Sequence, residues 1–175
     1  MAALLSRLDV DPGALEDVIA GCAYPEAAQG NNIARIVALR AGLPLEVGGM
    51  TVNRFCGSSM SAIHIAAAQI EAGQGEAYLC FGVESMTMVP QGGFNFSPNP
   101  WLLEHTQAYI TMGQTAENVA ALHDIPRSTQ DEMALTSHRK AAKAREAGWL
   151  RGGRYALATQ CIGGGQGIAT VLERL

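Results

Sequence analysis

A cysteine between a strand and a helix is the residue of this chain best placed to do chemistry. Val47 to Phe55 has the composition of a strand, Cys56 follows it, and Ser58 or Ser59 begins a helix. Backbone N–H groups and the positive dipole at the start of a helix favour a thiolate and can hold the oxygen of a carbonyl under attack. The pattern predicts that Cys56 is a nucleophile. The alternative is a buried structural cysteine, the commoner role of an isolated cysteine.

A second cysteine, Cys161, precedes a loop that reads Gly-Gly-Gly-Gln-Gly over residues 163–167. Glycines leave the backbone bare, as a site that binds a ligand through main-chain groups requires. A phosphate-binding loop is a weak alternative, because the Lys-Ser/Thr pair of a P-loop is missing and no long helix follows. A glycine-rich hairpin without a ligand is the plain structural alternative. The residues alone leave these interpretations open.

Alternating strands and helices must position these two cysteines. Short apolar runs at residues 17–22 and 77–83 predict buried strands. Asn31 or Asn32 is expected to cap a helix that runs to residue 41, and the helix after Cys56 should end at Gly73. Strands and helices that alternate in this way predict an α/β layer with parallel strands.

The pattern changes after residue 87. Residues 88–100 predict a long loop, Thr111 with Gln114 predicts a helix that begins with a capping box, and Pro126 suits the first turn of another helix. Strands are expected at residues 154–160 and 168–172, on either side of the glycine loop. We therefore expect an α/β core over residues 1–87, a mostly helical loop subdomain over residues 88–150, and a strand–glycine loop–strand segment over residues 151–175.

Composition limits the function classes. The chain has 175 residues, 48% of them hydrophobic and 16% charged, with a net charge of −4. These values exclude a disordered polyelectrolyte, and they predict neither a nucleic-acid nor a membrane partner. The four cysteines are widely separated and lack the spacing of a zinc site. We expect free thiols, no bound metal and a cytoplasmic location.

Four segments, in this order along the chain, carry a family resemblance. They read TVNRFCGSS at residues 51–59, GVESMT at 82–87, MGQTAENVA at 112–120 and YALATQCIGGGQG at 155–167. They resemble the active-cysteine, Gly-Val-Glu-Ser-Met, loop-domain and C-terminal segments of the thiolases, the acyl-CoA C-acyltransferases. The resemblance covers essentially the whole chain and implies a truncated, thiolase-like layered α/β fold.

The resemblance implies a role for each matched residue. Cys56 would take an acyl group from a thioester, and Cys161 would act as the thiol acid/base. The backbone amides of Cys56 and Gly163 would form the oxyanion hole, and Met112 would line the acyl pocket. The reaction would be thiolysis of a 3-ketoacyl-CoA, as in β-oxidation of fatty acids, or the reverse Claisen condensation. CoA and its thioesters would be the substrates, no cofactor is implied, and a homodimer or homotetramer is expected.

The chain also departs from the family pattern. Family members are longer, and we expect a piece before Met1 and a larger piece near Leu150-Arg151 to be missing. The larger piece would carry the Gly-His-Pro motif whose histidine activates the nucleophile. The four histidines present stand in other contexts. We expect a core or interface position for His64, a loop for residue 105 and a helix end for residue 123. His138 begins a basic cluster that extends to residue 145. That cluster is expected to be a solvated helix face, with contact to a CoA phosphate as the alternative.

Two functional hypotheses follow from these observations. The first is an acyltransferase that works through Cys56, where Cys161 separates thiolases from ketosynthases, which use histidine at that position. Thr111 favours the degradative, broader-chain branch, because short-chain biosynthetic members carry histidine there. The second hypothesis is a truncated, non-catalytic thiolase-like fragment that acts only in assembly, and the missing histidine segment motivates it.

Overall fold

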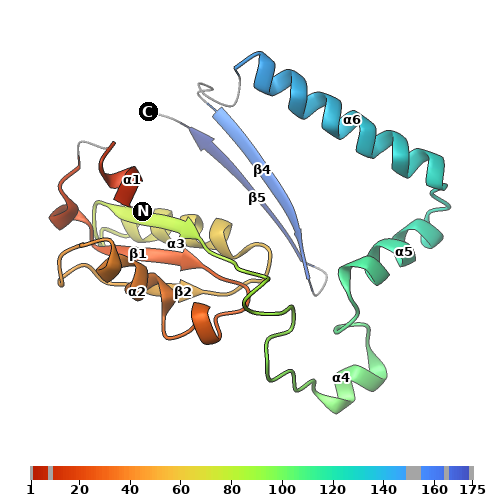
Figure 1. Ribbon diagram of the computed structural model, residues 1–175, viewed down its shortest axis with the longest axis horizontal. Helices are drawn as coiled ribbons and strands as arrows, with labels where there is room; N and C mark the ends of the chain where they lie inside the picture. The colour runs from red at the N-terminus through yellow and green to blue at the C-terminus, as the bar shows by residue number, and fades with distance from the viewer. Residues whose placement is uncertain (1, 8–9, 149–154, 164–165, 174–175) are drawn as a thin grey trace. The chain divides into compact units, whose positions relative to one another are not determined.

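The computed structural model describes residues 2–7, 10–148, 155–163 and 166–173. Packing divides the chain into two compact units (Figure 1). The first unit comprises residues 1–97 and 159–169, and the second comprises residues 98–158 and 170–175. The division into three domains at residues 87 and 150 stays a prediction.

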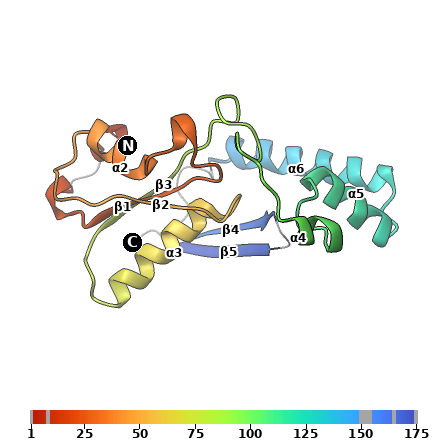
Figure 2. The same ribbon diagram turned by 90° about the horizontal axis from the view of Figure 1, so that it is seen from below.

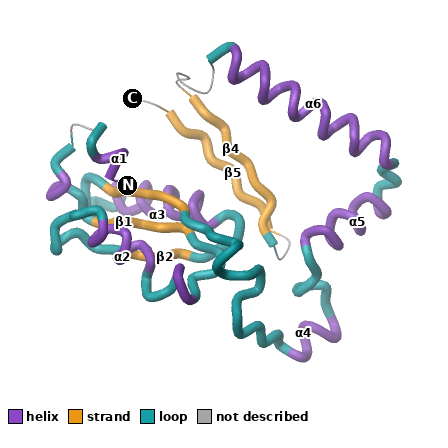
Figure 3. Tube along the Cα trace, in the orientation of Figure 1, coloured by secondary structure: helices purple, strands orange, loops and turns teal. Residues whose placement is uncertain are grey.

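The helices and strands mostly follow the sequence expectations (Figure 3). The helices are α1 Ala2–Leu5, α2 Ile33–Arg40, α3 Ser58–Glu71, α4 Pro100–His105, α5 Met112–Leu122 and α6 Arg127–Glu146. The strands are β1 Asp17–Gly21, β2 Met50–Val52, β3 Tyr78–Gly82, β4 Tyr155–Ile162 and β5 Gln166–Glu173. The strand expected over residues 47–55 is thus much shorter than predicted, and helix α4 was not predicted.

The first unit is built on a parallel sheet of strand order β2-β1-β3. In the register, Gly21 at the end of β1 lies between Val52 of β2 and Gly82 of β3. Helix α2 connects β1 to β2, helix α3 connects β2 to β3, and the two helices cover opposite faces of the sheet (Figure 2). The predicted α/β class with parallel strands is confirmed.

Strand β1 is buried on both faces because its side chains alternate between two hydrophobic cores. Val18 points into the core shared with α2, and Ile19 points into the core shared with α3. The α2 core also contains Leu15, Ala38, Leu43, Val47 and Leu79. The α3 core also contains Ala62 and Ala66. These small alanines let the helix lie close to the strands.

Two glycines at the carboxyl ends of neighbouring strands determine where α3 begins. A β-carbon added at Gly21 would lie 2.2 Å from the backbone nitrogen of Ser59, and one added at Gly82 would lie 2.1 Å from the Ser59 hydroxyl oxygen. Only glycine permits so close an approach between a helix and a strand. The first turn of α3 therefore rests directly on the ends of β1 and β3.

The cap of α2 differs from the prediction. Asn32 occupies the N-cap position with a φ of 54°, but its side chain does not bond to the helix. Its amide instead donates to the carbonyl of Gly49 (2.7 Å) and its side-chain oxygen accepts from the Thr51 hydroxyl (2.8 Å). The Thr51 oxygen accepts the N–H of Ala34 at 3.1 Å. A threonine on β2 thus supplies the helix cap that was expected from the local asparagine.

The described helices of the second unit have no buried residues. Thr111 caps α5 as predicted, because its hydroxyl oxygen accepts the N–H of Gln114 at 3.2 Å. Pro126 is the N-cap residue of α6 and not, as predicted, a residue of its first turn. This part of the chain is mostly helical, as the sequence indicated.

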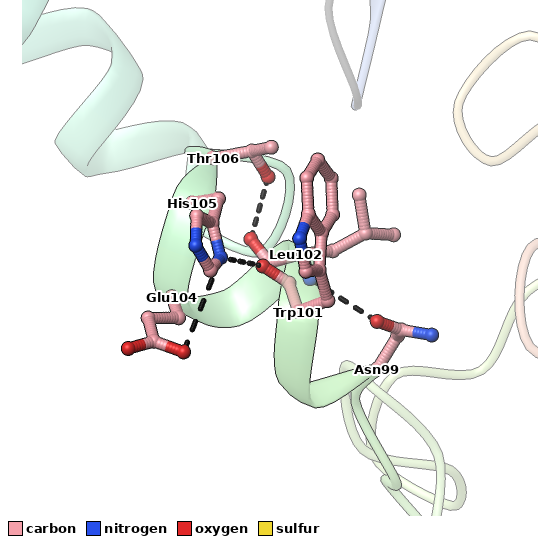
Figure 4. Close-up of polar contacts among 6 residues, drawn as sticks. All are labelled: Asn99, Trp101, Leu102, Glu104, His105 and Thr106. Atoms are coloured by element: carbon pink, nitrogen blue, oxygen red, sulfur yellow. Dashed lines mark hydrogen bonds and ion pairs between the residues drawn. The ribbon is translucent and has the colours of Figure 1, made fainter.

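Local contacts explain helix α4 (Figure 4). The Asn99 side chain accepts the N–H of Leu102 at 3.1 Å, and the Thr106 hydroxyl donates to the Leu102 carbonyl at 2.6 Å. The rings of Trp101 and His105 stack with their centroids 4.8 Å apart. An asparagine cap followed by proline at the first helical position is a recognised start signal, which the sequence analysis did not use.

Strands β4 and β5 pair into a two-stranded sheet around the glycine loop. The predicted strands at residues 154–160 and 168–172 are confirmed with shifted ends, and residues 164 and 165 of the loop lie outside the described part. Within the described residues, every helix is too short or too polar to cross a lipid bilayer.

Asp17 at the start of β1 makes the stability of the fold depend on pH. Burial raises the pKa of its carboxyl group above the ordinary value, although the hydrogen bond from the Val18 N–H acts in the opposite direction. A raised pKa means that the folded chain binds the proton more tightly than the unfolded chain does. Stability from this group is therefore lost as the pH rises from the unfolded pKa through the folded pKa.

We expect the Asp17→Asn variant to gain stability relative to the wild type as the pH rises from about 3 to 7. Urea unfolding of both proteins across this range isolates the contribution of Asp17, because the other groups titrate in both. A stability difference that stays constant, or that shrinks toward neutral pH, would contradict the raised pKa.

Candidate active site

Cys56 lies in the turn between β2 and α3, with an exposed side chain. The predicted strand–turn–helix setting is confirmed. The turn lies beyond the carboxyl ends of the parallel strands, where α/β sheets of this winding bind their ligands. The free thiol of Cys56 is therefore accessible at the edge of the sheet that is usually functional.

Three hydrogen bonds from side chains hold this turn. The Asn53 side-chain oxygen accepts the N–H of Phe55 at 2.8 Å. The Ser58 hydroxyl oxygen accepts the N–H of Arg54 at 2.9 Å, and the same hydroxyl donates to the Phe55 carbonyl at 2.6 Å. Phe55 has a φ of 43°, a left-handed conformation that is uncommon for a residue other than glycine. The surrounding bonds stabilise this conformation immediately before Cys56.

Two of the amides at the start of α3 are not available to the sulfur in the way that the sequence predicted. The Gly57 N–H donates to the Arg54 carbonyl at 3.0 Å, and the Ser58 N–H donates to the Phe55 carbonyl at 3.1 Å. These two groups are therefore engaged within the turn and are not free to face the sulfur. The role of the Cys56 amide in an oxyanion hole stays a prediction.

Gly57 brings the two cysteine segments together within the first unit. A β-carbon added at Gly57 would lie 2.4 Å from the Cδ1 atom of Ile162 and 3.3 Å from the Cγ2 atom of Ile168. Ile162 is buried and stands between Cys161 and Gly163 in the sequence. The side chains of Ile162 and Ile168, on the two strands that flank the glycine loop, thus lie close to the residue after Cys56. Ile162 fills the space beside Gly57.

The other predicted site residues are only partly described. Cys161 lies on β4, and its side chain is outside the described part of the structure. Gly163 follows β4, and its carbonyl accepts a hydrogen bond from the Gln166 side chain at 3.2 Å. Met112 is the half-buried first residue of α5 in the second unit. The acid/base role of Cys161, the oxyanion role of Gly163 and the pocket role of Met112 stay predictions.

The histidines lie on helices or at a helix end. His64 is exposed on α3, so the core position expected for it is wrong. His105 is the last residue of α4 and not a loop residue. His123 ends α5 as predicted, and His138 is exposed on α6 within the basic cluster. The exposed α6 face agrees with the solvated interpretation of that cluster.

Glu84, two residues after the end of β3, is a polar residue at the same edge of the sheet that was not identified by itself from the sequence. Its carboxylate accepts the N–H of Ala23 at 2.6 Å and the side-chain amide of Gln29 at 2.8 Å. The Cys22 sulfur lies 3.9 Å from the same carboxylate. A carboxylate after one parallel strand and a cysteine after its neighbour are brought together at one sheet edge. The positions of Cys22 and Glu84 after two neighbouring parallel strands were the signal in the sequence from which this contact could have been predicted.

Cys22 and Cys80 have environments unlike that of Cys56. Burial raises the pKa of the Cys22 thiol, and the negative charge of Glu84 raises it further. Burial also raises the pKa of the Cys80 thiol, with a smaller contribution from Asp17. Both thiols are held in the unreactive protonated form, which fits structural cysteines.

Iodoacetamide at mildly alkaline pH is expected to alkylate Cys56 at least about tenfold faster than Cys22 or Cys80. Cys56 is exposed, whereas the other two thiols are shielded and protonated. Peptide mass spectrometry after timed quenching measures each rate in the same sample, and a sample in urea provides the control in which the differences should disappear. Equal rates for Cys22 and Cys56 in the folded chain would contradict this assignment.

The first 152 residues match the model of the thiolase N-terminal domain family. Three similar proteins are each named 3-ketoacyl-CoA thiolase. That of Saccharophagus degradans is 50% identical over 141 residues, which is 79% of this chain and 36% of the relative. Those of Shewanella loihica and Pseudoalteromonas translucida are 47% and 46% identical, over 82% and 86% of this chain and 38% and 39% of the relatives.

The chain therefore spans little more than a third of the length of these relatives. The family match ends before the segment at residues 155–167, so the likeness of that segment rests on its own sequence. Among the described residues, no group of three or more His, Cys, Asp or Glu side chains is arranged to hold a metal ion. The family match, the small parallel sheet between two helices and the position of Cys56 agree, and the chain belongs to the thiolase family through that family's N-terminal domain.

Proposed function

We propose that this chain is an acyl-CoA C-acyltransferase in which Cys56 carries the acyl group as a thioester. The observation that carries the proposal is the exposure of Cys56 at the carboxyl edge of the sheet, in a turn closed by side-chain hydrogen bonds. The names of the relatives support CoA thioesters as substrates. The nearby passage of the Cys161 segment beside Gly57 supports a second thiol at the same site.

The first half of the reaction cleaves a 3-ketoacyl-CoA. The Cys56 thiolate attacks the 3-keto carbon, and the bond between C2 and C3 breaks. Its electron pair passes to the departing acetyl-CoA enolate, which takes a proton at C2 from the Cys161 thiol. Acetyl-CoA leaves, the acyl group remains on Cys56 as a thioester, and Cys161 remains as a thiolate.

The second half returns both cysteines to their starting states. The Cys161 thiolate removes the proton from the thiol of CoA, and the CoA sulfur attacks the acyl carbonyl. The bond between the acyl carbon and the Cys56 sulfur breaks, which releases a shortened acyl-CoA and the Cys56 thiolate. The amides of Cys56 and Gly163 would stabilise the oxyanion, and Met112 would contact the acyl chain. The reverse sequence is a Claisen condensation.

The physiological setting belongs to the same proposal. We place the reaction in the degradation of fatty acids, in the cytoplasm, with the chain working as a homodimer or homotetramer and without a cofactor. Thr111, at the N-cap of α5, supports substrates of broader chain length through the family resemblance. Nucleic acid and membranes are not proposed as partners.

Thiolysis of 3-ketoacyl-CoAs of several chain lengths, with added CoA and detection of acetyl-CoA by chromatography, tests the activity. The Cys56→Ala variant should lose turnover by a factor of about 10³ or more, because a nucleophile has no substitute at this site. Cys161→Ala should lose turnover too but still accept an acyl group on Cys56. Cys80→Ala is the control and should turn over normally. Absence of acetyl-CoA at every chain length would overturn the proposal.

The alternative function is a non-catalytic role in assembly. Leu122 of α5 and Met133 of α6 are each 76% exposed, and association with another copy would remove such apolar side chains from water. A second copy of the chain is the partner we would test. Sedimentation velocity of the wild type and the Leu122→Lys variant measures this association. An oligomer that Leu122→Lys dissociates, together with a wild type that produces no acetyl-CoA, would favour assembly, whereas turnover would exclude it as the only role.

A further inference from the structure

We propose that Glu84 and Asn53 are positioning residues, which hold the turn before Cys56 through one chain of hydrogen bonds. This chain of hydrogen bonds starts at the carboxyl end of β3, passes through the segment after β1 and ends at the residue before Cys56. The inference rests on the proposed role of Cys56 as the acyl carrier. It adds to that proposed function by giving two further side chains a role in positioning the thiol.

The first link connects the ends of β3 and β1. Glu84 accepts the N–H of Ala23 at 2.6 Å and the side-chain amide of the buried Gln29 at 2.8 Å. Gln29 also donates to the Tyr24 carbonyl at 3.0 Å and accepts the N–H of Ser85. Bonds to an ionised carboxylate are stronger than those between neutral groups. Glu84 therefore holds the main chain directly at Ala23 and, through Gln29, at Tyr24.

The second link runs from Ala23 to the end of β2. The Asn53 side-chain amide donates to the Ala23 carbonyl at 2.9 Å. The Asn53 side chain therefore has its rotation fixed by a segment about thirty residues earlier in the chain. Because the N–H of Ala23 is held by Glu84, both ends of this residue are engaged, and a shift of the carboxylate is transmitted to Asn53.

The third link reaches the turn that presents the nucleophile. The Asn53 side-chain oxygen accepts the N–H of Phe55 at 2.8 Å, two residues ahead, which is the geometry of an Asx-turn. Phe55 is held at a φ of 43°, which an L-residue does not keep without support. The ring of Phe55 also lies 6.2 Å, between centroids, from that of Tyr24 in the same segment after β1. Loss of these supports would let the peptide before Cys56 rotate and would move the thiol.

Hydrogen exchange, measured by NMR on the full-length ¹⁵N-labelled protein, tests the chain of hydrogen bonds without any assay of activity. The Asn53→Ala variant removes the acceptor of the Phe55 amide. The Glu84→Gln variant retains the size of the side chain but places an NH₂ group where one of the two accepting oxygens stood. Both variants should speed exchange of the Phe55 amide by about tenfold or more, while the Ile19 amide in the sheet core stays unchanged. The controls are Asn95→Ala and Glu46→Gln, both at exposed positions.

The double variant distinguishes transmitted from independent effects. If the two residues act in series, Glu84→Gln should add nothing to Phe55 exchange once Asn53→Ala is present. Asn53→Asp keeps the oxygen that accepts from Phe55 but loses the donor to Ala23. In that background the Phe55 amide should exchange about as fast as in Glu84→Gln, because the same link is broken, and it should become insensitive to Glu84→Gln. Additive effects on Phe55 exchange, or a Glu84→Gln effect confined to Ala23, would overturn the inference.

Acylation of Cys56 by an acyl-CoA provides the functional readout. Asn53→Ala and Glu84→Gln should each lower the acylation rate at saturating thioester by about tenfold, with the half-saturating concentration unchanged. A purely structural role would instead destabilise the fold and leave the folded fraction fully reactive. A wild type that never becomes acylated would refute the proposed function, yet the exchange data would still test the hydrogen-bond chain. A wild type that is acylated at the same rate as both variants would refute the positioning roles alone.

Discussion

The Gly21→Ala variant is expected to lose about 3 kcal/mol of unfolding free energy. The new β-carbon would lie 2.2 Å from the Ser59 nitrogen and 2.4 Å from the Ser58 carbonyl carbon. Both are backbone atoms of the first turn of α3, so no side chain can rotate to relieve the contact. The helix must move away from β1 and must carry Cys56 with it. Urea unfolding followed by circular dichroism measures the loss.

Gly13→Ala is the matched control for this prediction. The atoms nearest to a β-carbon at Gly13 would be those of the Asp11 carboxylate, at 3.4 Å and beyond, which is an ordinary contact. We expect its unfolding midpoint to stay close to that of the wild type. A Gly21→Ala variant as stable as Gly13→Ala would show that α3 does not rest on the strand ends as described.

The second large effect is expected from Ile19→Ala, which should destabilise the fold by about 4 kcal/mol. Ile19 lies on the central strand with 0% of its surface exposed, and it packs against Ala62 and Ala66 of α3. Ala62 and Ala66 have no side-chain rotamers with which to fill the space left by the removed carbons. A loss of this size is a large share of the stability of an ordinary domain, about 5–15 kcal/mol.

Ile36→Ala supplies the comparison for Ile19→Ala. Ile36 lies on α2 with 42% of its surface exposed, so the same chemical change removes far less buried surface. We expect a loss below about 1 kcal/mol, partly offset by the better helix propensity of alanine. Equal losses from the two substitutions in urea titrations would contradict the assignment of Ile19 to the core.

Local signals predicted the elements whose stabilising contacts are local. Thr111 was identified as the cap of α5 because its partner lies three residues away. Asn32 is the N-cap residue of α2 as predicted, but its side chain makes no capping hydrogen bond, because Thr51, seventeen residues beyond Ala34, accepts the helix amide instead. The strand expected over residues 47–55 shortened to Met50–Val52, since the following residues form the turn before Cys56.

At the candidate site, too, the sequence predicted local features but not contacts between distant segments. The strand–turn–helix pattern was sufficient to place Cys56 at an exposed junction, and the structure agrees. It could not reveal that Ile162 fills the space beside Gly57, because these residues are more than a hundred positions apart. The contact of Glu84 with Ala23 also spans 61 positions. Side chains that support the turn from distant segments become visible only after the strands are paired.

The most direct test of the account is to map where an acyl group becomes attached to the wild-type chain. Brief incubation with an acyl-CoA, rapid quenching and peptide mass spectrometry identify the acylated residue, with Cys56→Ala as the control. If Cys56 is the nucleophile, one acyl group per chain should be found on Cys56; the Cys56→Ala variant should lack it, and added CoA should remove it from the wild type. No acylation, or acyl groups spread evenly over the four cysteines, would contradict the claim that Cys56 is the nucleophile.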